Sequence, residues 1–252
     1  MLTLPSQAEQ SAFVASLAPQ RLRAFRRATG GNDRRAVELY LIDAELASLM
    51  HGTIRGVEVL LRERMHRSLV AAFDDRWYLT LQSQFDLKTK RKIDEAVTLV
   101  GRNNAGKVIA QLMFGAWTGL LNAGGPMTGV RNAAIADYET ALWSPALRNA
   151  FIGSPTRTHV HALAQSLNWA RNRINHCEPV VFGFPQQGQG APGRQQRKSP
   201  ERVVADARTL LTLLDVDVAA WMTRWHPLDR LMRDPLAQDA LPRTSPTIDL
   251  LT

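Results

Sequence analysis

The chain has 252 residues, enough for one large domain or for one domain with extensions. It is 45% hydrophobic and 21% charged, an ordinary globular balance with enough material for a core. The single cysteine, Cys177, excludes an internal disulfide framework, and the most apolar stretch (108–121) is shorter than the roughly 20 residues that a membrane span needs. Residues 1–10 lack the basic and apolar regions of a secretory signal, so we expect a cytoplasmic protein without membrane contact.

Charge points to the kind of partner. Lys and Arg number 31 against 23 for Asp and Glu, which gives a formal charge of +8 and a pI of about 10.3. Such an excess favours a polyanionic partner, because each neutralised phosphate releases counterions. A mildly basic surface without a nucleic-acid role is the alternative.

Helical periodicity dominates the first half of the chain. A short helix is expected over 7–17, and Pro19 suits the first turn of a second helix, which Gly30 and Gly31 end. Asn32 or Asp33 can cap a long third helix that continues to about Phe73. These first helices lead us to expect an N-terminal helical extension over 1–31.

The second half is also read as helical. Asp86 can cap a helix that runs to about Val100, and a further helix is expected over 106–121, before a Gly/Pro loop at 122–129. Pro145 opens a short helix, and the next helix runs from 156 to about 177 because Glu178-Pro179 ends it. We expect a mobile loop at 183–200, a last long helix over 200–225 and a tail over 227–252. No strand is convincing, so the predicted fold class is all-α.

The helix expected at 156–177 carries two stripes at about 100° per residue. One is apolar and forms a buried seam: Val160, Leu163, Leu167, Ala170 and Ile174. The other is polar, with Arg, His and amide side chains but no Lys, Glu or Asp: Arg157, His161, Gln165, Asn168, Asn172 and His176. The polar stripe is read either as an ordinary solvated face or as a surface that binds phosphates and moves protons.

The end of this helix holds the chemistry that we consider. A histidine can take a proton from an RNA 2′-hydroxyl or give one to the leaving oxygen, and a guanidinium can hold the scissile phosphate. Arg171 lies about 140° around an ideal helix from His176, so either the last turn is distorted or a second copy completes the site across a two-fold axis. Arg173 competes with Arg171 for the phosphate. The neighbouring Cys177 is expected to be a small buried group.

The string ARNRINHCEPVVF (170–182) resembles the Arg-x4–6-His motif of HEPN ribonucleases, in the Arg-Asn-x3-His form that Abi-like abortive-infection proteins carry before Glu-Pro. Three further segments resemble the same group in order and spacing: GVEVLLRERM, GKVIAQLMFGAW and ALWSPALRNAF. The resemblance implies a HEPN-type helical bundle over 32–226, preceded by additional N-terminal helices. It also implies that the bundle dimerises so that two motifs face one cleft.

Matched residue by residue, the resemblance implies Arg171 as phosphate binder, His176 as acid/base and Asn172 as a positioning group. The other expected substrate-binding residues are Arg173, Glu58, Arg62, Asn168 and His161. Glu58 and Arg62 resemble a polar patch that borders such clefts, although a simple intrahelical ion pair is the alternative. Two positions depart from the family pattern: Glu63 replaces the usual Asn, and Cys177 replaces a frequent second His.

The Arg and His residues predict metal-independent RNA cleavage that leaves 2′,3′-cyclic phosphate and 5′-hydroxyl ends, and the resemblance implies an endoribonuclease of phage defence or of toxin–antitoxin type. Expected partners are RNA, a second copy of the chain and an antitoxin or another component of a defence complex. No cofactor and no metal are expected, since the chain has one cysteine and His159 and His161 face apart on a helix. Two alternatives stay open: a HEPN module that binds RNA or a nucleotide without cutting, and a regulatory protein-interaction partner.

Overall fold

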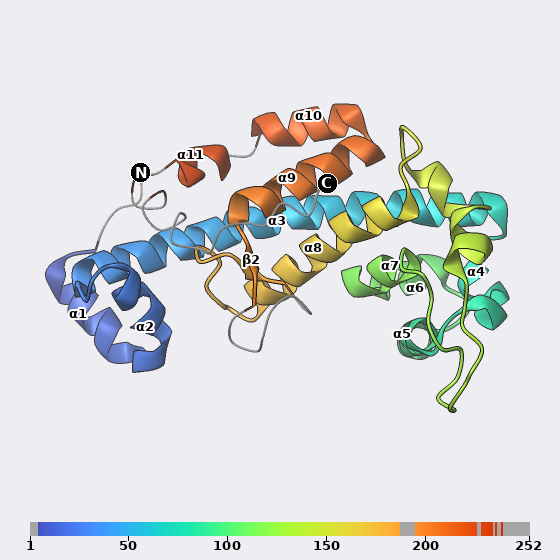
Figure 1. Cartoon of the computed structure of the whole chain (residues 1–252), viewed down its shortest axis with the longest axis horizontal. Helices are drawn as coiled ribbons and strands as arrows, with labels where there is room; N and C mark the ends of the chain where they lie inside the picture. Colours follow the sequence, from blue (N-terminus) through green and yellow to red (C-terminus); the bar gives the residue numbers. More distant parts are fainter. Residues whose placement is uncertain (1–4, 187–194, 226–227, 234, 236–237, 239–252) are drawn as a thin grey trace. The chain divides into compact units, whose positions relative to one another are not determined.

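The computed structural model describes residues 5–186, 195–225, 228–233, 235 and 238 (Figure 1). The described residues are mostly helical, with eleven α-helices, and this confirms the all-α class. By their contacts they form two units. The described residues of Met1–Gly52, Ala170–Val204 and Trp225–Thr252 make up the first unit, and Thr53–Trp169 and Ala205–Arg224 the second.

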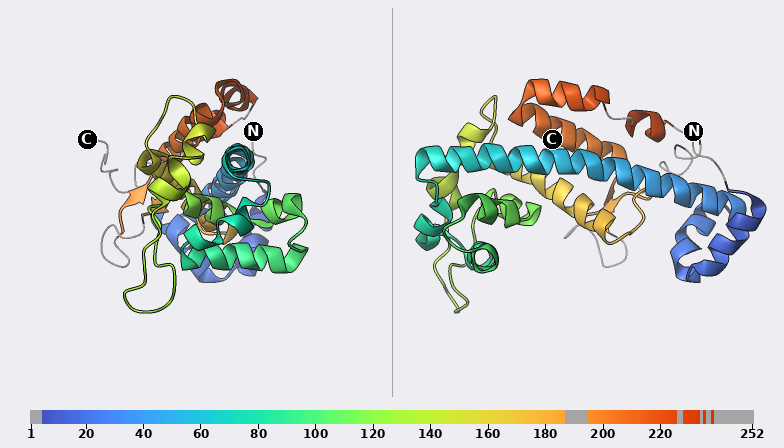
Figure 2. Two further views of the ribbon diagram at one scale, coloured as in Figure 1. Left: turned by 90° about the vertical axis from the view of Figure 1, so that its right-hand side faces the viewer. Right: turned by 180° about the vertical axis from the view of Figure 1, so that it is seen from behind.

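The first unit begins with the two short helices that the sequence predicts. Helix α1 (Gln7–Ser16) starts with a capping box, in which Ser6 and Glu9 exchange hydrogen bonds, and α2 (Pro19–Ala28) starts on its proline. Gly30 and Gly31 then take positive φ angles of 64° and 83°, which glycine adopts without steric cost. Figure 1 and the right-hand view of Figure 2 show these helices (dark blue) beside the start of α3.

Helix α3 (Asp33–Ala72) is 40 residues long. Asn32 caps it, because its side-chain oxygen accepts a hydrogen bond from the Arg35 amide at 3.0 Å. Asp74 follows its end and accepts from the Arg76 amide and the Thr80 hydroxyl, each at 2.7 Å. Both boundaries agree with the sequence prediction.

The second unit packs short helices on a core of tryptophans and phenylalanines. In chain order its helical elements are α4 (Trp77–Thr80), η1 (Gln82–Gln84), α5 (Leu87–Val100), α6 (Ala105–Gln111), α7 (Phe114–Leu120), η2 (Glu139–Trp143) and η3 (Leu147–Ala150). The rings of Trp77 and Trp117 meet at 5.9 Å between centroids, and both side chains are fully buried. Asp86 caps α5 as predicted, by accepting from the Thr89 amide at 2.7 Å.

Two predicted helices are broken. The helix expected over 106–121 divides into α6 and α7, because the backbone of Leu112 and Met113 is extended and the Leu112 carbonyl accepts from the Trp117 indole at 3.1 Å. The helix expected over 200–225 divides into α9 (Pro200–Leu214) and α10 (Val216–Trp225). Asp215 separates them and caps α10, accepting from the Val218 amide at 3.0 Å.

The structure also contains elements that the sequence did not predict. Phe184–Pro185 (β1) pairs antiparallel with Arg197–Lys198 (β2), and Leu228–Met232 forms a last helix, α11. The expected mobile loop at 183–200 therefore begins and ends in a short ladder, and its middle lies outside the described residues, as does most of the expected tail over 227–252. Within the described ranges, no helix combines the length and the apolar character that crossing a bilayer requires.

Candidate functional site

Helix α8 (Arg157–Asn175) carries most of the motif and ends at Asn175, one residue before His176. The amide of His176 donates to the Asn172 carbonyl at 3.0 Å, that of Cys177 to Ile174 at 2.9 Å and that of Glu178 to Arg173 at 3.1 Å. Cys177 has a positive φ of 52°. This is the Schellman pattern of a helix C-terminus, with Cys177 in the left-handed position that glycine usually takes.

The cap corrects two expectations. The helix stops at Asn175 rather than at about residue 177, so His176 is its capping residue. Cys177 is exposed, not buried, because the left-handed turn carries it to the surface. The bond from His176 to Asn172 is that of a regular α-helix, so the last turn is not distorted to bring Arg171 and His176 together. A site completed by a second copy stays a prediction.

Arg173 fixes the segment that follows the cap. Its Nε donates to the Pro179 carbonyl at 2.7 Å and its Nη1 to the Glu178 carboxylate, while its side chain is only 17% exposed. Burial lowers the pKa of Arg173, and the nearby carboxylates of Glu178 and Asp43 oppose that shift. Arg173 therefore has a structural role that competes with the substrate-binding role expected of it.

Asp43 of α3 holds the same segment from the other side. Its Oδ1 accepts hydrogen bonds from the amides of Val180 and Val181, both at 2.7 Å. Burial raises the pKa of Asp43 to about 6, and the two amides and Arg173 act in the opposite direction. Asp43 is not among the residues predicted from the sequence, although its place between the apolar Ile42 and Ala44 was a signal for it.

The remaining motif residues face outward to different degrees. Asn172 and His176 are exposed, and Arg171 is half-buried. The end of α8 thus presents the imidazole of His176 and the amide of Asn172 to the surface, and the guanidinium of Arg171 lies within about one and a half turns of His176 along the helix. Such groups can bind a phosphate and transfer protons. Arg171, Asn172, Arg173 and His176 all belong to the first unit, but Arg171 and His176 point to different sides of the helix.

The other expected substrate-binding residues belong to the second unit. His161 is half-buried, and its pKa is lowered by burial and then by Arg157. Asn168 lies beside Gly115 of α7. A Cβ added at this glycine would lie 3.6 Å from the Asn168 amide group. Glu58 and Arg62 are half-buried on α3, and the Nε of Arg62 lies 3.6 Å from Glu63 Oε1.

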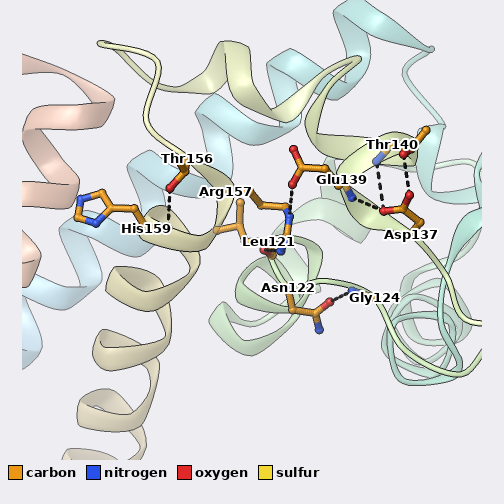
Figure 3. Close-up of polar contacts among 9 residues, drawn as sticks. All are labelled: Leu121, Asn122, Gly124, Asp137, Glu139, Thr140, Thr156, Arg157 and His159. Carbon is orange, nitrogen blue, oxygen red and sulfur yellow. Dashed lines mark hydrogen bonds and ion pairs between the residues drawn. The ribbon is translucent and has the colours of Figure 1, made fainter. Parts of the chain in front are cut away.

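The first residue of the polar stripe, Arg157, is bound within the second unit (Figure 3). Its Nε donates to Glu139 at 2.7 Å and its Nη1 to the Leu121 carbonyl at 2.9 Å. Arg157, His161, Gln165 and Asn168 are all half-buried, whereas Asn172 and His176 are exposed. The stripe is therefore not one solvated face, because only its C-terminal end is open. The apolar stripe is buried as predicted from Val160 to Ala170, and Ile174 is half-buried.

Among the described residues, no group of three or more His, Cys, Asp or Glu side chains could hold a metal ion. No protein-family model matches the chain, and neither a curated protein nor a solved structure was found to match it. The resemblance to HEPN proteins consequently rests on the four sequence segments that carry it.

Proposed function

We propose that the protein is a metal-independent endoribonuclease with a HEPN-type bundle, which acts in the cytoplasm in phage defence or as the toxin of a toxin–antitoxin pair. The observation that supports it best is the end of α8, where the exposed His176 and Asn172 follow the half-buried Arg171 on a capped helix. The excess of 31 basic over 23 acidic residues agrees with an RNA substrate.

The proposed reaction needs one base, one acid and one cation. The imidazole of His176 takes the proton from the 2′-hydroxyl, and the 2′-oxygen attacks the adjacent phosphorus. The bond from phosphorus to the 5′-oxygen breaks, and that oxygen receives a proton from an imidazolium. The products are a 2′,3′-cyclic phosphate and a 5′-hydroxyl. Arg171 would stabilise the charge on the phosphoryl oxygens, and the amide of Asn172 would orient the phosphate.

A regular last turn separates Arg171 from His176 by about 140° around the helix axis. We therefore include a homodimer in the proposal, in which Arg171 of one copy and His176 of the other act on one phosphate. A two-fold axis also supplies a second imidazole, so that one could act as base and the other as acid. An antitoxin or a defence-complex partner would then act by covering this end of α8.

Arg173 and Asp43 support this role indirectly. Together they fix residues 178–181, which begin two positions after His176, through four hydrogen bonds. A catalytic imidazole acts efficiently only where its backbone is held in place, since small displacements cost much of the rate. We assign both residues as positioning residues rather than as groups that touch RNA.

The test compares wild type with His176→Ala on a structured RNA in the presence of EDTA, with analysis of the product ends. Loss of cleavage by about 10²–10⁴-fold is expected, the usual contribution of a general acid or base. His159→Ala is the matched control, because His159 is an exposed histidine of the same helix. It should cleave like wild type, and circular dichroism should show that both variants are folded.

Equal cleavage by all three proteins would disprove the catalytic role of His176. If none of them cuts and all bind RNA with an affinity that falls as salt rises, the chain is a binding module instead. Absence of both cleavage and RNA binding at moderate salt would favour the third alternative, a protein-interaction partner.

A further inference from the structure

The first unit contains a cavity of about 1010 Å³ that lies beside the motif without including Arg171, Asn172 or His176. Its walls come from α2, from the first half of α3, from residues 173–182 and from Arg197. Pockets that enclose small molecules commonly measure about 300–1,000 Å³. The cavity is thus large enough for a small organic ligand.

Aromatic rings and small side chains form its apolar part. The ring of Phe25 is fully buried and packs between Tyr40, at 5.3 Å, and Phe182, at 5.2 Å between centroids. Tyr40, whose ring also contacts Phe13 at 5.3 Å, and Phe182 are only half-buried, and both line the cavity. Alanines on α2 and α3, Ala24 and Ala44 among them, leave room above the rings. A planar ring of a ligand could stack here.

The charge of the lining is strongly unbalanced. Four arginines line the cavity with two carboxylates: Arg21, Arg27, Arg173 and Arg197 with Asp43 and Glu178. Both carboxylates are already engaged, since Asp43 accepts two backbone amides and Glu178 binds Arg173. An excess of two positive charges in a concave site attracts an anion.

Arg197 shows where the anion is needed. Its Nε donates to the Phe182 carbonyl at 2.6 Å and its Nη2 to the Gly183 carbonyl at 2.7 Å, and neither acceptor carries a charge. Burial, followed by the nearby Arg173, lowers the pKa of Arg197 to about 10. The one carboxylate that opposes this shift, Glu178, already binds Arg173, so a phosphate beside the Arg197 guanidinium would add negative charge where two guanidinium groups share one carboxylate.

We propose that the cavity binds a free nucleoside phosphate, with its base against Tyr40 and Phe182 and its phosphates held by Arg21, Arg27 and Arg197. Arg21 already donates one hydrogen bond, to the Cys177 carbonyl at 2.9 Å. Since a guanidinium has five N–H donors, Arg21 can hold a phosphate as well. Because Cys177 also lines the cavity, this ligand would lie near the residue that directly follows His176. The proposal does not depend on the ribonuclease proposal.

The first experiment is calorimetric titration of the full chain with ADP and with GDP. One saturable site is expected, with an affinity between micromolar and millimolar. Adenosine and inorganic pyrophosphate each carry one half of ADP, and each should bind at least about tenfold more weakly than ADP. No saturable binding of either nucleotide would overturn the proposal, as would binding confined to a single-stranded oligonucleotide.

Two variants locate the site. Arg27→Ala should weaken binding by about tenfold, whereas Arg23→Ala, which removes another exposed arginine of α2 that does not line the cavity, should change it by less than about twofold. Ala44→Trp should fill the cavity and abolish binding. Equal losses in Arg27→Ala and Arg23→Ala would mean nonspecific attraction and would overturn the site. His176→Ala should bind the nucleotide like wild type, so failure of the ribonuclease proposal would leave this one standing.

Discussion

The two ends of helix α8 are held in chemically similar ways. At the N-terminal end, Arg157 donates to the carboxylate of Glu139 and to the carbonyl of Leu121. At the C-terminal end, Arg173 donates to the carboxylate of Glu178 and to a carbonyl, that of Pro179. Both arginines are largely buried, with 13% and 17% of their side chains exposed.

The difference is the distance along the chain to the partners. Arg157 binds residues 18 and 36 positions earlier, so it joins α8 to other elements of the second unit. Arg173 binds residues five and six positions later, so it shapes the segment that directly follows its own helix. One motif helix therefore combines an end that secures the packing of the fold with an end that orders an exposed site.

The largest expected effects come from replacing each arginine by methionine, which keeps the length of the side chain but removes its donors. Arg173→Met leaves the Pro179 carbonyl and the Glu178 carboxylate without this partner and removes the cation near buried Asp43. We expect it to lower the free energy of unfolding by about 2–4 kcal/mol, and Arg157→Met by about 1–3 kcal/mol. Urea denaturation measures both, and Arg148→Met, at an exposed position, should stay within about 0.5 kcal/mol of wild type.

Hydrogen exchange separates the two ends. In Arg173→Met the amides of Val180 and Val181 should exchange faster than global unfolding requires, because one support of their segment is gone. In Arg157→Met the same two amides should exchange only as fast as the lower free energy of global unfolding requires. RNA cleavage, if His176 is catalytic, should fall more in Arg173→Met than in Arg157→Met. Identical exchange in both variants would show that the two arginines do not act locally in different ways.

The same distinction explains what could be predicted from the sequence. Ser6, Asn32 and Asp86 cap helices through residues three positions away, so local reading found the starts of α1, α3 and α5. Asp215 also caps a helix through a residue three positions away. The helical spacing of apolar residues continues on both sides of it, however, so the sequence predicted one helix where the structure has α9 and α10. The break at Leu112 depends on a bond to the indole of Trp117, which periodicity does not report.

For the candidate site, the sequence located the motif and its buried seam but not the groups that hold the motif in place. Asp43 meets Val180 across 137 positions of chain, and such a contact has no periodic signature. The exposure of Cys177 accompanies its positive φ at the C-terminus of α8, a position at which glycine is common but which the sequence fills with cysteine. The apolar and basic cavity of the first unit depends on α2 and α3 lying beside the segment after α8, which only the fold shows.

Asp43 offers a pH-dependent test of the C-terminal end. Its pKa is about 6 in the folded protein and near its usual 3.8 in the unfolded chain, so folding takes up a proton between these values. The stability due to this proton is complete below about pH 4 and is lost as the pH rises through 6. In Asp43→Asn the side-chain oxygen still accepts both amides, and no charge develops.

We therefore expect the free energy of unfolding of wild type, relative to Asp43→Asn, to fall by on the order of 2 kcal/mol between pH 4 and pH 7. Urea denaturation at a series of pH values measures this difference. Asp33→Asn is the control with opposite sign: the hydrogen bond with Arg26 lowers the pKa of Asp33, so the stability that Asp33 contributes is lost as the pH falls below its usual pKa of 3.8 and changes little between pH 4 and pH 7. A difference between wild type and Asp43→Asn that stays constant with pH would show that Arg173 and the amides already balance the burial of Asp43.

The smallest effect concerns the backbone at both ends of α8. Cys177 follows the helix with a φ of 52°, and Ser154 precedes it with a φ of 50°, although side chains with a Cβ disfavour this region. Cys177→Gly and Ser154→Gly should each raise the free energy of unfolding by about 0.5–1 kcal/mol, because glycine adopts positive φ without that cost. Cys177→Ala keeps the Cβ and should bring no gain, which separates the backbone effect from loss of the thiol. If Ser154→Gly stabilises and Cys177→Gly does not, Cys177 is held without strain, and the C-terminal end owes its order to Arg173 and Asp43 instead.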